Sequence, residues 1–111
     1  LDFSAEQAKL GKTVGDDFRD GKITLPVILA FRRSDDEERQ FWRRTLEDLE
    51  QSDGDLQHGI ELMIKHNALH DTIERARHYG AIARDSLGIF DDGPVKRSFD
   101  DLIDFCIDRA Y

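Results

Sequence analysis

The sequence predicts an all-α protein, a bundle of about five helices. Two patterns carry this prediction: apolar residues recur at spacings of three and four over most of the chain, and the alternation typical of a half-buried strand occurs nowhere. The length of 111 residues allows one modest core and argues against two independent domains. A single helical unit is therefore expected.

The first 24 residues differ from the rest in their glycine content. Gly11, Gly15 and Gly21 are expected to interrupt a long helix, so we predict a short helical start followed by a structured loop. Thr24 precedes Leu25 and Pro26, a pattern typical of a helix N-cap with proline in the first turn. The helix predicted from residue 25 ends near Arg33.

Three further helices follow from caps and spacing. Ser34 with Glu37 fits a capping box and predicts a helix over roughly 35–50. The next predicted helix runs from about Leu56 to Lys65, with Asn67 as a left-handed stop. The clearest helical period follows, with small residues at its centre that permit close approach of another helix: Leu69, Ile73, Ala76, Gly80, Ala83 and Leu87.

A last helix is predicted from Pro94 to the C-terminus, after a restart at Asp91 and Asp92. Its apolar stripe consists of Val95, Phe99, Leu102, Ile103, Cys106 and Ala110. Because Cys106 is the single cysteine and stands among apolar residues, no internal disulfide is possible and we expect a buried thiol in a reducing compartment.

Charge and hydropathy exclude two classes of protein. A formal net charge of -8 disfavours nucleic-acid binding. No apolar run approaches the ~18 residues that a spanning helix needs, so we expect no membrane span. The chain begins without Met or a signal peptide; it is expected to be part of a longer chain, and cytoplasmic is the default location.

Residues 2–26 are the one segment whose composition points to chemistry. Lys12 and Lys22 follow glycines, which let the backbone and ammonium groups approach phosphate oxygens. Carboxylates between the lysines are hard oxygen ligands of the kind that Mg²⁺ prefers. A metal-diphosphate site needs both features, although the same residues also fit a solvated, charged loop.

A family resemblance distinguishes these alternatives. Three stretches closely resemble the segment that begins inside the second aspartate-rich motif of trans-type polyprenyl diphosphate synthases: Leu10-Gly11-Lys12, Gly15-Asp16-Asp17 and Gly21-Lys22-Ile23-Thr24-Leu25-Pro26. Asp2 resembles the last aspartate of that Asp-Asp-x-x-Asp motif. Residues 73–80 and 105–111 are similar to the C-terminal helices of bacterial long-chain members of the octaprenyl and decaprenyl type.

The resemblance implies the C-terminal part of an isoprenoid-synthase fold, with residues 1–24 as an active-site segment and 25–111 as a C-terminal helical bundle. It implies that Lys12 and Lys22 contact an allylic diphosphate and that Asp2 helps to hold Mg²⁺. Asp17 would be a water-mediated metal ligand or a partner of one, with weaker candidates at Asp16 and Asp20.

The implied reaction condenses isopentenyl diphosphate with the allylic diphosphate. Its product would be the long side chain of a quinone. The parent enzyme is expected to be a homodimer. The first aspartate-rich motif and the isopentenyl diphosphate site belong upstream in this family, so these 111 residues alone are expected to be inactive. A short-chain farnesyl or geranylgeranyl synthase, a terpene cyclase and a non-catalytic helical interaction module are the alternatives.

Two other clusters have less specific patterns. His66 and His70 stand four apart, as a helical metal pair would, but a helix break at Asn67 would separate their faces. A group of arginines could bind anionic lipid, but neighbouring carboxylates largely neutralise its positive charge. The group consists of Arg32, Arg33, Arg39, Arg43 and Arg44. Solvated or structural roles are expected for both clusters.

Overall fold

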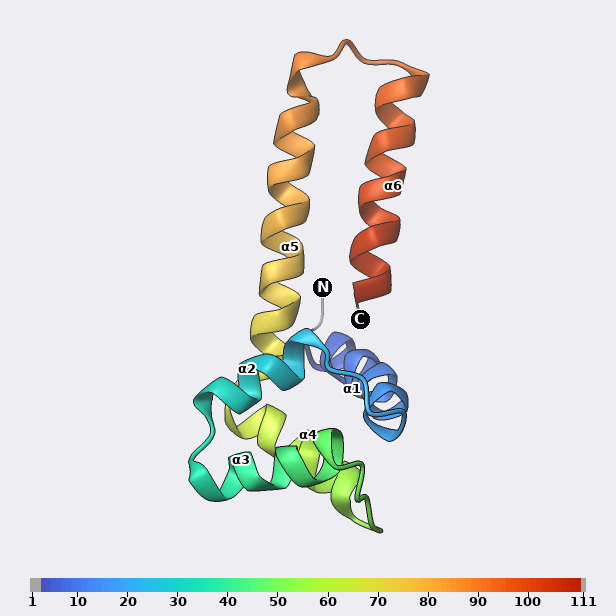
Figure 1. Cartoon of the computed structure of the whole chain (residues 1–111). Helices are drawn as coiled ribbons and strands as arrows, with labels where there is room; N and C mark the ends of the chain where they lie inside the picture. The colour runs from blue at the N-terminus through green and yellow to red at the C-terminus, as the bar shows by residue number, and fades with distance from the viewer. Residues whose placement is uncertain (1–2, 111) are drawn as a thin grey trace.

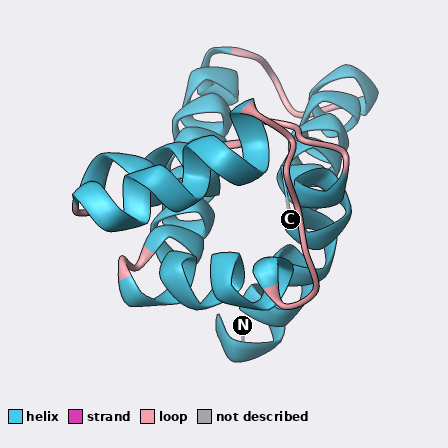
Figure 2. Ribbon diagram, turned by 60° about the horizontal axis from the view of Figure 1, so that its bottom comes forward, coloured by secondary structure: helices cyan, strands magenta, loops and turns pink. Residues whose placement is uncertain are grey.

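The computed structural model describes residues 3–110, without the side chains of residues 3, 4, 6 and 110. Six α-helices are found in this range: α1 (Phe3–Arg19), α2 (Leu25–Arg33), α3 (Asp36–Trp42), α4 (Asp55–Lys65), α5 (Ala68–Ser86) and α6 (Pro94–Ala110). A π-helical turn, η1 (Arg43–Glu47), continues α3, and a short 3₁₀ turn, η2 (Leu87–Ile89), follows α5. All regular elements of the described part are helical (Figure 2), which confirms the all-α prediction.

The molecule has a compact base and a long arm. Helices α1 to α4 and the start of α5 form the base, from which α5 and α6 extend as an antiparallel hairpin (Figure 1). The principal extents of 53 × 25 × 22 Å reflect this arm. Helix α6 packs mainly on α5.

The core lies in the base and is centred on one face of α1. Leu10, Val14 and Phe18 of α1 are at most 2% exposed. The ring of Phe18 lies 6.4 Å from that of Phe41 and the same distance from that of Trp42, between centroids. Trp42 is buried in this core, and its indole nitrogen donates to the Ser34 hydroxyl at 3.2 Å.

The predicted loop after a short helical start was wrong, because α1 is continuous through Gly11 and Gly15. Each glycine costs a helix up to about 1 kcal/mol relative to alanine. Burial of three apolar side chains spaced four apart outweighs that cost, since each contributes about 1.5–3 kcal/mol. The chain turns only at Gly21, whose φ of 74° is left-handed.

The predicted boundaries of α2 and α4 are confirmed within one residue, and so is the left-handed Asn67, with φ of 57°. The capping box of α3 is displaced by one residue from the prediction. Asp35 accepts from the Glu38 backbone N–H at 2.8 Å, and Glu38 accepts from the Asp35 N–H at 3.0 Å. The Ser34 hydroxyl instead lies back along α2, where it donates to the Ala30 carbonyl at 2.7 Å and accepts from the Trp42 indole N–H.

The predicted seam of α5 is confirmed at Leu69, Ile73 and Gly80, which are buried, and its last residue, Leu87, is buried in η2. At Gly80 the absence of a side chain makes room for Ile107 of α6.

The prediction of a buried Cys106 was wrong: the residue is exposed. Because α6 packs on α5 along one edge only, the rest of its apolar stripe lies open, with Phe99 48% and Leu102 52% exposed. The described helices include none both long and apolar enough to cross a membrane.

Candidate functional site

The predicted site residues lie on the second half of α1 and on the turn after it. Lys12 and Asp16 are one helical turn apart and share one side of α1. Asp17 lies one residue further round the helix, on the neighbouring flank with Thr13. Asp20 is exposed at the end of α1. Asp2, the predicted metal ligand, lies outside the described residues.

The structure brings Asp17 and Lys22 together. The Lys22 backbone N–H donates to the Asp17 carbonyl at 2.9 Å, and the Lys22 Nζ lies 3.8 Å from Asp17 Oδ1. Gly21 makes this possible, since its left-handed backbone reverses the chain directly after α1. The Lys22 side chain remains 65% exposed, so its ammonium can approach a ligand while it stays beside Asp17.

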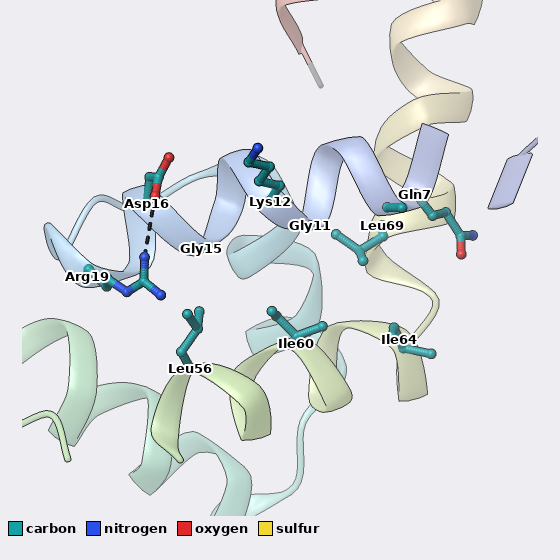
Figure 3. A pocket seen from close by; sticks show the side chains of 11 residues that line it. Gln7, Gly11, Lys12, Gly15, Asp16, Arg19, Leu56, Ile60, Ile64 and Leu69 are labelled. Carbon is teal, nitrogen blue, oxygen red and sulfur yellow. Dashed lines mark hydrogen bonds and ion pairs between the residues drawn. The ribbon is translucent and has the colours of Figure 1, made fainter. Parts of the chain in front are cut away.

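Lys12 and Asp16 border a cavity of about 620 Å³ between α1 and α4 (Figure 3). Leu56, Ile60 and Ile64 of α4 form its apolar floor. Lys12 lies at its rim and points away from α4, whereas the Asp16 carboxylate accepts from Arg19 Nη1 at 3.4 Å. The sequence interpretation missed Arg19, although its spacing of three from Asp16 is typical of a helical ion pair.

Asp17 faces a second cavity, of about 530 Å³, between α1, the start of α2, α5 and α6. Arg75 of α5 and Arg109 of α6 line the same cavity as Asp17. The Thr24 hydroxyl is also there, and its oxygen is buried without a hydrogen-bond partner in the described part of the chain. No local pattern identifies these arginines, because only the tertiary fold brings α5 and α6 to α1.

The carboxylate of Asp17 is a ligand of the type that Mg²⁺ prefers. Proteins usually hold Mg²⁺ with one or two carboxylates, and waters and phosphate oxygens complete its octahedron. Asp17 is a carboxylate of this kind, 27% exposed and beside an ammonium that would pair with phosphate. Within residues 3–110, no group of three or more acidic, His or Cys side chains is arranged to hold a metal by itself.

The histidine and arginine clusters are tied to carboxylates of the scaffold. Glu38 accepts from Lys65 Nζ at 2.9 Å and lies 3.1 Å from His66 Nε2. The Lys65 hydrogen bond, together with the Asp35 N–H, lowers the pKa of Glu38 to about 2 despite its burial. Among the arginines, Arg33 pairs with Asp71 at 2.7 Å and Arg44 with Asp55 at 2.9 Å. Both clusters thus have structural partners.

Comparison with known proteins identifies the family of this chain. Residues 1–63 match the polyprenyl synthetase family. The octaprenyl diphosphate synthase of Haemophilus influenzae is 30% identical over 111 residues, which are 100% of this chain and 33% of that protein. A geranylgeranyl pyrophosphate synthase of Geoglobus acetivorans is 32% identical, again over 100% of this chain and 33% of the relative. The chain thus spans about a third of the length of these relatives.

Two solved structures share the fold. A decaprenyl diphosphate synthase from Rhodobacter capsulatus aligns with a TM-score of 0.80 and 40% identity, over 94% of this chain and 34% of that one. A polyprenyl synthase from Caulobacter crescentus, solved with calcium and isoprenyl diphosphate, aligns with a TM-score of 0.71 and 37% identity, over 87% and 30%. With more than half of its residues matched to the family, this chain belongs to the polyprenyl synthetases.

Proposed function

We propose that this chain is the C-terminal third of a Mg²⁺-dependent prenyltransferase that condenses isopentenyl diphosphate with an allylic diphosphate. The observation that carries the proposal is the turn after α1, which holds Lys22 beside Asp17 in a chain of this family. A calcium ion and an isoprenyl diphosphate together in the Caulobacter crescentus structure support a cation-diphosphate site.

In the proposed reaction the allylic C–O bond breaks and its electron pair leaves with the pyrophosphate. The double bond of isopentenyl diphosphate then forms the new C–C bond, and a proton is lost from the adduct. Lys12 and Lys22 contribute ammonium groups that stabilise the charge on the departing oxygens. Bound Mg²⁺ would neutralise further charge on the same group. Asp17 lies 3.8 Å from the Lys22 ammonium and would offer one carboxylate to the metal.

The mechanism assigns no proton acceptor to these 111 residues. The first aspartate-rich motif and the isopentenyl diphosphate site are expected upstream, as is most of the homodimer interface. The 111-residue chain alone is therefore expected to form no product.

The proposed product is a long polyprenyl chain of the kind attached to quinones. The octaprenyl and decaprenyl synthases among the relatives favour this product. The geranylgeranyl synthase favours a short-chain enzyme as the second candidate, because it matches over the whole of this chain at similar identity. Both candidates use the same lysines and the same metal.

The test is product formation by the complete chain to which these residues belong, supplied with an allylic diphosphate, isopentenyl diphosphate and Mg²⁺. Lys12→Ala and Lys22→Ala should each lower kcat by about 10²–10³-fold, the usual loss for one group that stabilises developing charge. Lys96→Ala is the control, since Lys96 pairs with Asp92 at the start of α6, away from this site. Chromatography of the product gives its length.

A folded complete chain that forms no elongated product under any primer or Mg²⁺ concentration would refute the enzymatic proposal and favour a helical interaction module. Product that persists in both lysine variants would refute the assigned roles but leave the enzyme class intact.

A further inference from the structure

We propose that the segment Leu49–Gln51 braces the turn that carries Lys22, and that Leu49 and Gln51 are positioning residues for diphosphate binding. The inference rests on the proposed function, because it assigns residues that hold Lys22 and Asp17 in register. The sequence gives no hint of it, since the segment lies nearly thirty residues after the turn.

Gln51 connects the brace to the end of α1. Its side-chain Nε2 donates to the Phe18 carbonyl at 2.8 Å and to the Thr45 carbonyl at 3.0 Å. The Phe18 carbonyl also accepts from the Gly21 N–H at 3.0 Å. The side-chain amide of Gln51 therefore connects η1 to the Phe18 carbonyl, which is also the acceptor that closes the turn before Lys22.

Leu49 contacts the turn from the other direction. An added Cβ on Gly21 would lie only 2.5 Å from Leu49 Cδ2, so the leucine side chain fills the space directly over this glycine. Leu49 itself adopts a left-handed backbone with φ of 57°, which residues other than glycine seldom do. It is also 62% exposed, so core burial does not account for the strained conformation.

The far end of the brace is fixed by η1 and Arg44. The π-helical turn closes with a bond from the Asp48 N–H to the Arg43 carbonyl at 2.9 Å. Arg44 donates to the Glu50 carbonyl at 2.8 Å and pairs with the Asp55 carboxylate through two bonds, at 2.9 and 3.1 Å. Single π-turns are frequent at functional sites. Hydrogen bonds therefore hold the brace at both ends, and the Leu49 side chain packs on the turn that carries Lys22.

The experiment uses the complete chain and compares Gln51→Glu and Leu49→Gly with wild type. Glutamate keeps the size of glutamine but has no N–H to donate. Glycine accepts the left-handed backbone and removes only the side chain over Gly21. We expect kcat/KM for the allylic diphosphate to fall roughly ten- to a hundredfold in each variant, the usual cost of a small misplacement of a binding group. Gln40→Glu, on the exposed side of α3, is the matched control.

Two further measurements separate positioning from simple stability. The dissociation constant of Mg²⁺-pyrophosphate, measured by calorimetry, should rise about tenfold in Leu49→Gly while the melting temperature stays at the wild-type value or above it. Gly21→Ala should lose activity because its new methyl group meets Leu49, and the double variant Gly21→Ala/Leu49→Gly should regain part of it.

Variants that keep wild-type pyrophosphate affinity and kcat/KM would overturn the brace, as would losses that merely follow the fraction of unfolded protein. A wild-type chain without activity or pyrophosphate binding would instead remove the proposed function, and the brace with it. If the wild-type chain is active and the variants keep its activity and pyrophosphate affinity, the proposed brace is refuted and the proposed function stands.

Discussion

At the scale of the residue, Glu38 shows how a single side chain closes a helix start and connects distant segments. Its two oxygens contact the Asp35 N–H, Lys65 and His66. Ser34 with Glu37 predicted a capping box, but the box forms one residue later, at Asp35 and Glu38, because the Ser34 hydroxyl is engaged with the Ala30 carbonyl and the Trp42 indole.

The pH dependence of unfolding follows from this cluster. The Lys65 hydrogen bond is the main cause that lowers the pKa of Glu38 from 4.5 to about 2, and the Arg44 hydrogen bond lowers that of Asp55 from 3.8 to about 2. A lowered pKa stabilises the fold at any pH above the unfolded value, and the stabilisation is lost as the pH falls through the folded value. We therefore expect the melting temperature to fall between about pH 4.5 and 2.

The measurement is thermal unfolding by circular dichroism across that range, with Glu38→Gln and the exposed Glu37→Gln as a matched pair. Glu38→Gln should lower stability at neutral pH and flatten the acid loss, and Glu37→Gln should change neither. Identical acid profiles for wild type and Glu38→Gln would show that this carboxylate is not the group responsible.

The two adjacent carboxylates of α1 should differ in their effect on activity. Asp17 is 27% exposed and lies beside Lys22, a proposed diphosphate ligand, whereas Asp16 is 75% exposed and pairs with Arg19. Each pair by itself is worth about 0–1 kcal/mol, so the difference expected here comes from the proposed role of Asp17 in the site. In the complete chain, Asp17→Asn is expected to lower kcat/KM at least tenfold more than Asp16→Asn and to raise the Mg²⁺ concentration required for half-maximal rate. Equal effects of the two substitutions would contradict the assigned role of Asp17.

At the scale of the element, α1 shows that tertiary burial outweighs local propensity. Gly11 lies inside this helix with no neighbouring heavy atom within 4 Å of an added Cβ. Gly11→Ala should therefore stabilise the chain by about 0.5–1 kcal/mol, because alanine loses less backbone entropy in a helix. Urea unfolding of the 111-residue chain measures the change.

Gly21→Ala is the opposite control on the same segment, since it combines a left-handed backbone with the close approach of Leu49. It should destabilise the chain. If Gly11→Ala gave no gain, the segment would behave as the loop that the glycines predicted and not as a helix.

At the scale of the whole molecule, the α5–α6 arm carries an uncovered apolar face. Tyr79 and Ile82 of α5 and Phe99 and Leu102 of α6 are between 47% and 66% exposed. An apolar cavity of about 360 Å³ lies between these helices, lined in part by Leu102, Ile103 and Cys106. Apolar surface of this extent commonly marks a protein contact.

We expect the 111-residue chain to self-associate through this face. Sedimentation velocity should show a mass that rises with concentration, and Leu102→Lys should shift the equilibrium towards monomer. Asp101→Lys changes charge at the neighbouring exposed position of α6 and serves as the control. A monomer at every concentration would contradict the prediction.

The sequence by itself determined the helical class, most helix boundaries and the residues that mark the family. These features are local, because helix caps, an apolar period near 3.6 residues and the motif between Lys12 and Pro26 each depend on residues close together in the sequence. The spacing of Gly21 and Lys22 from Asp17 was also visible, but the contact between the two side chains depended on the left-handed turn.

Only the tertiary structure decided the conformation of α1, the exposure of Cys106, the cavity that Arg75 and Arg109 share with Asp17, and the brace at Leu49 and Gln51. Each of these depends on contacts between segments far apart in the chain. Burial of Leu10, Val14 and Phe18 cannot be read from the glycines beside them, and the exposure of an apolar stripe depends on which helices are present to cover it. Local patterns carry no information about such partners.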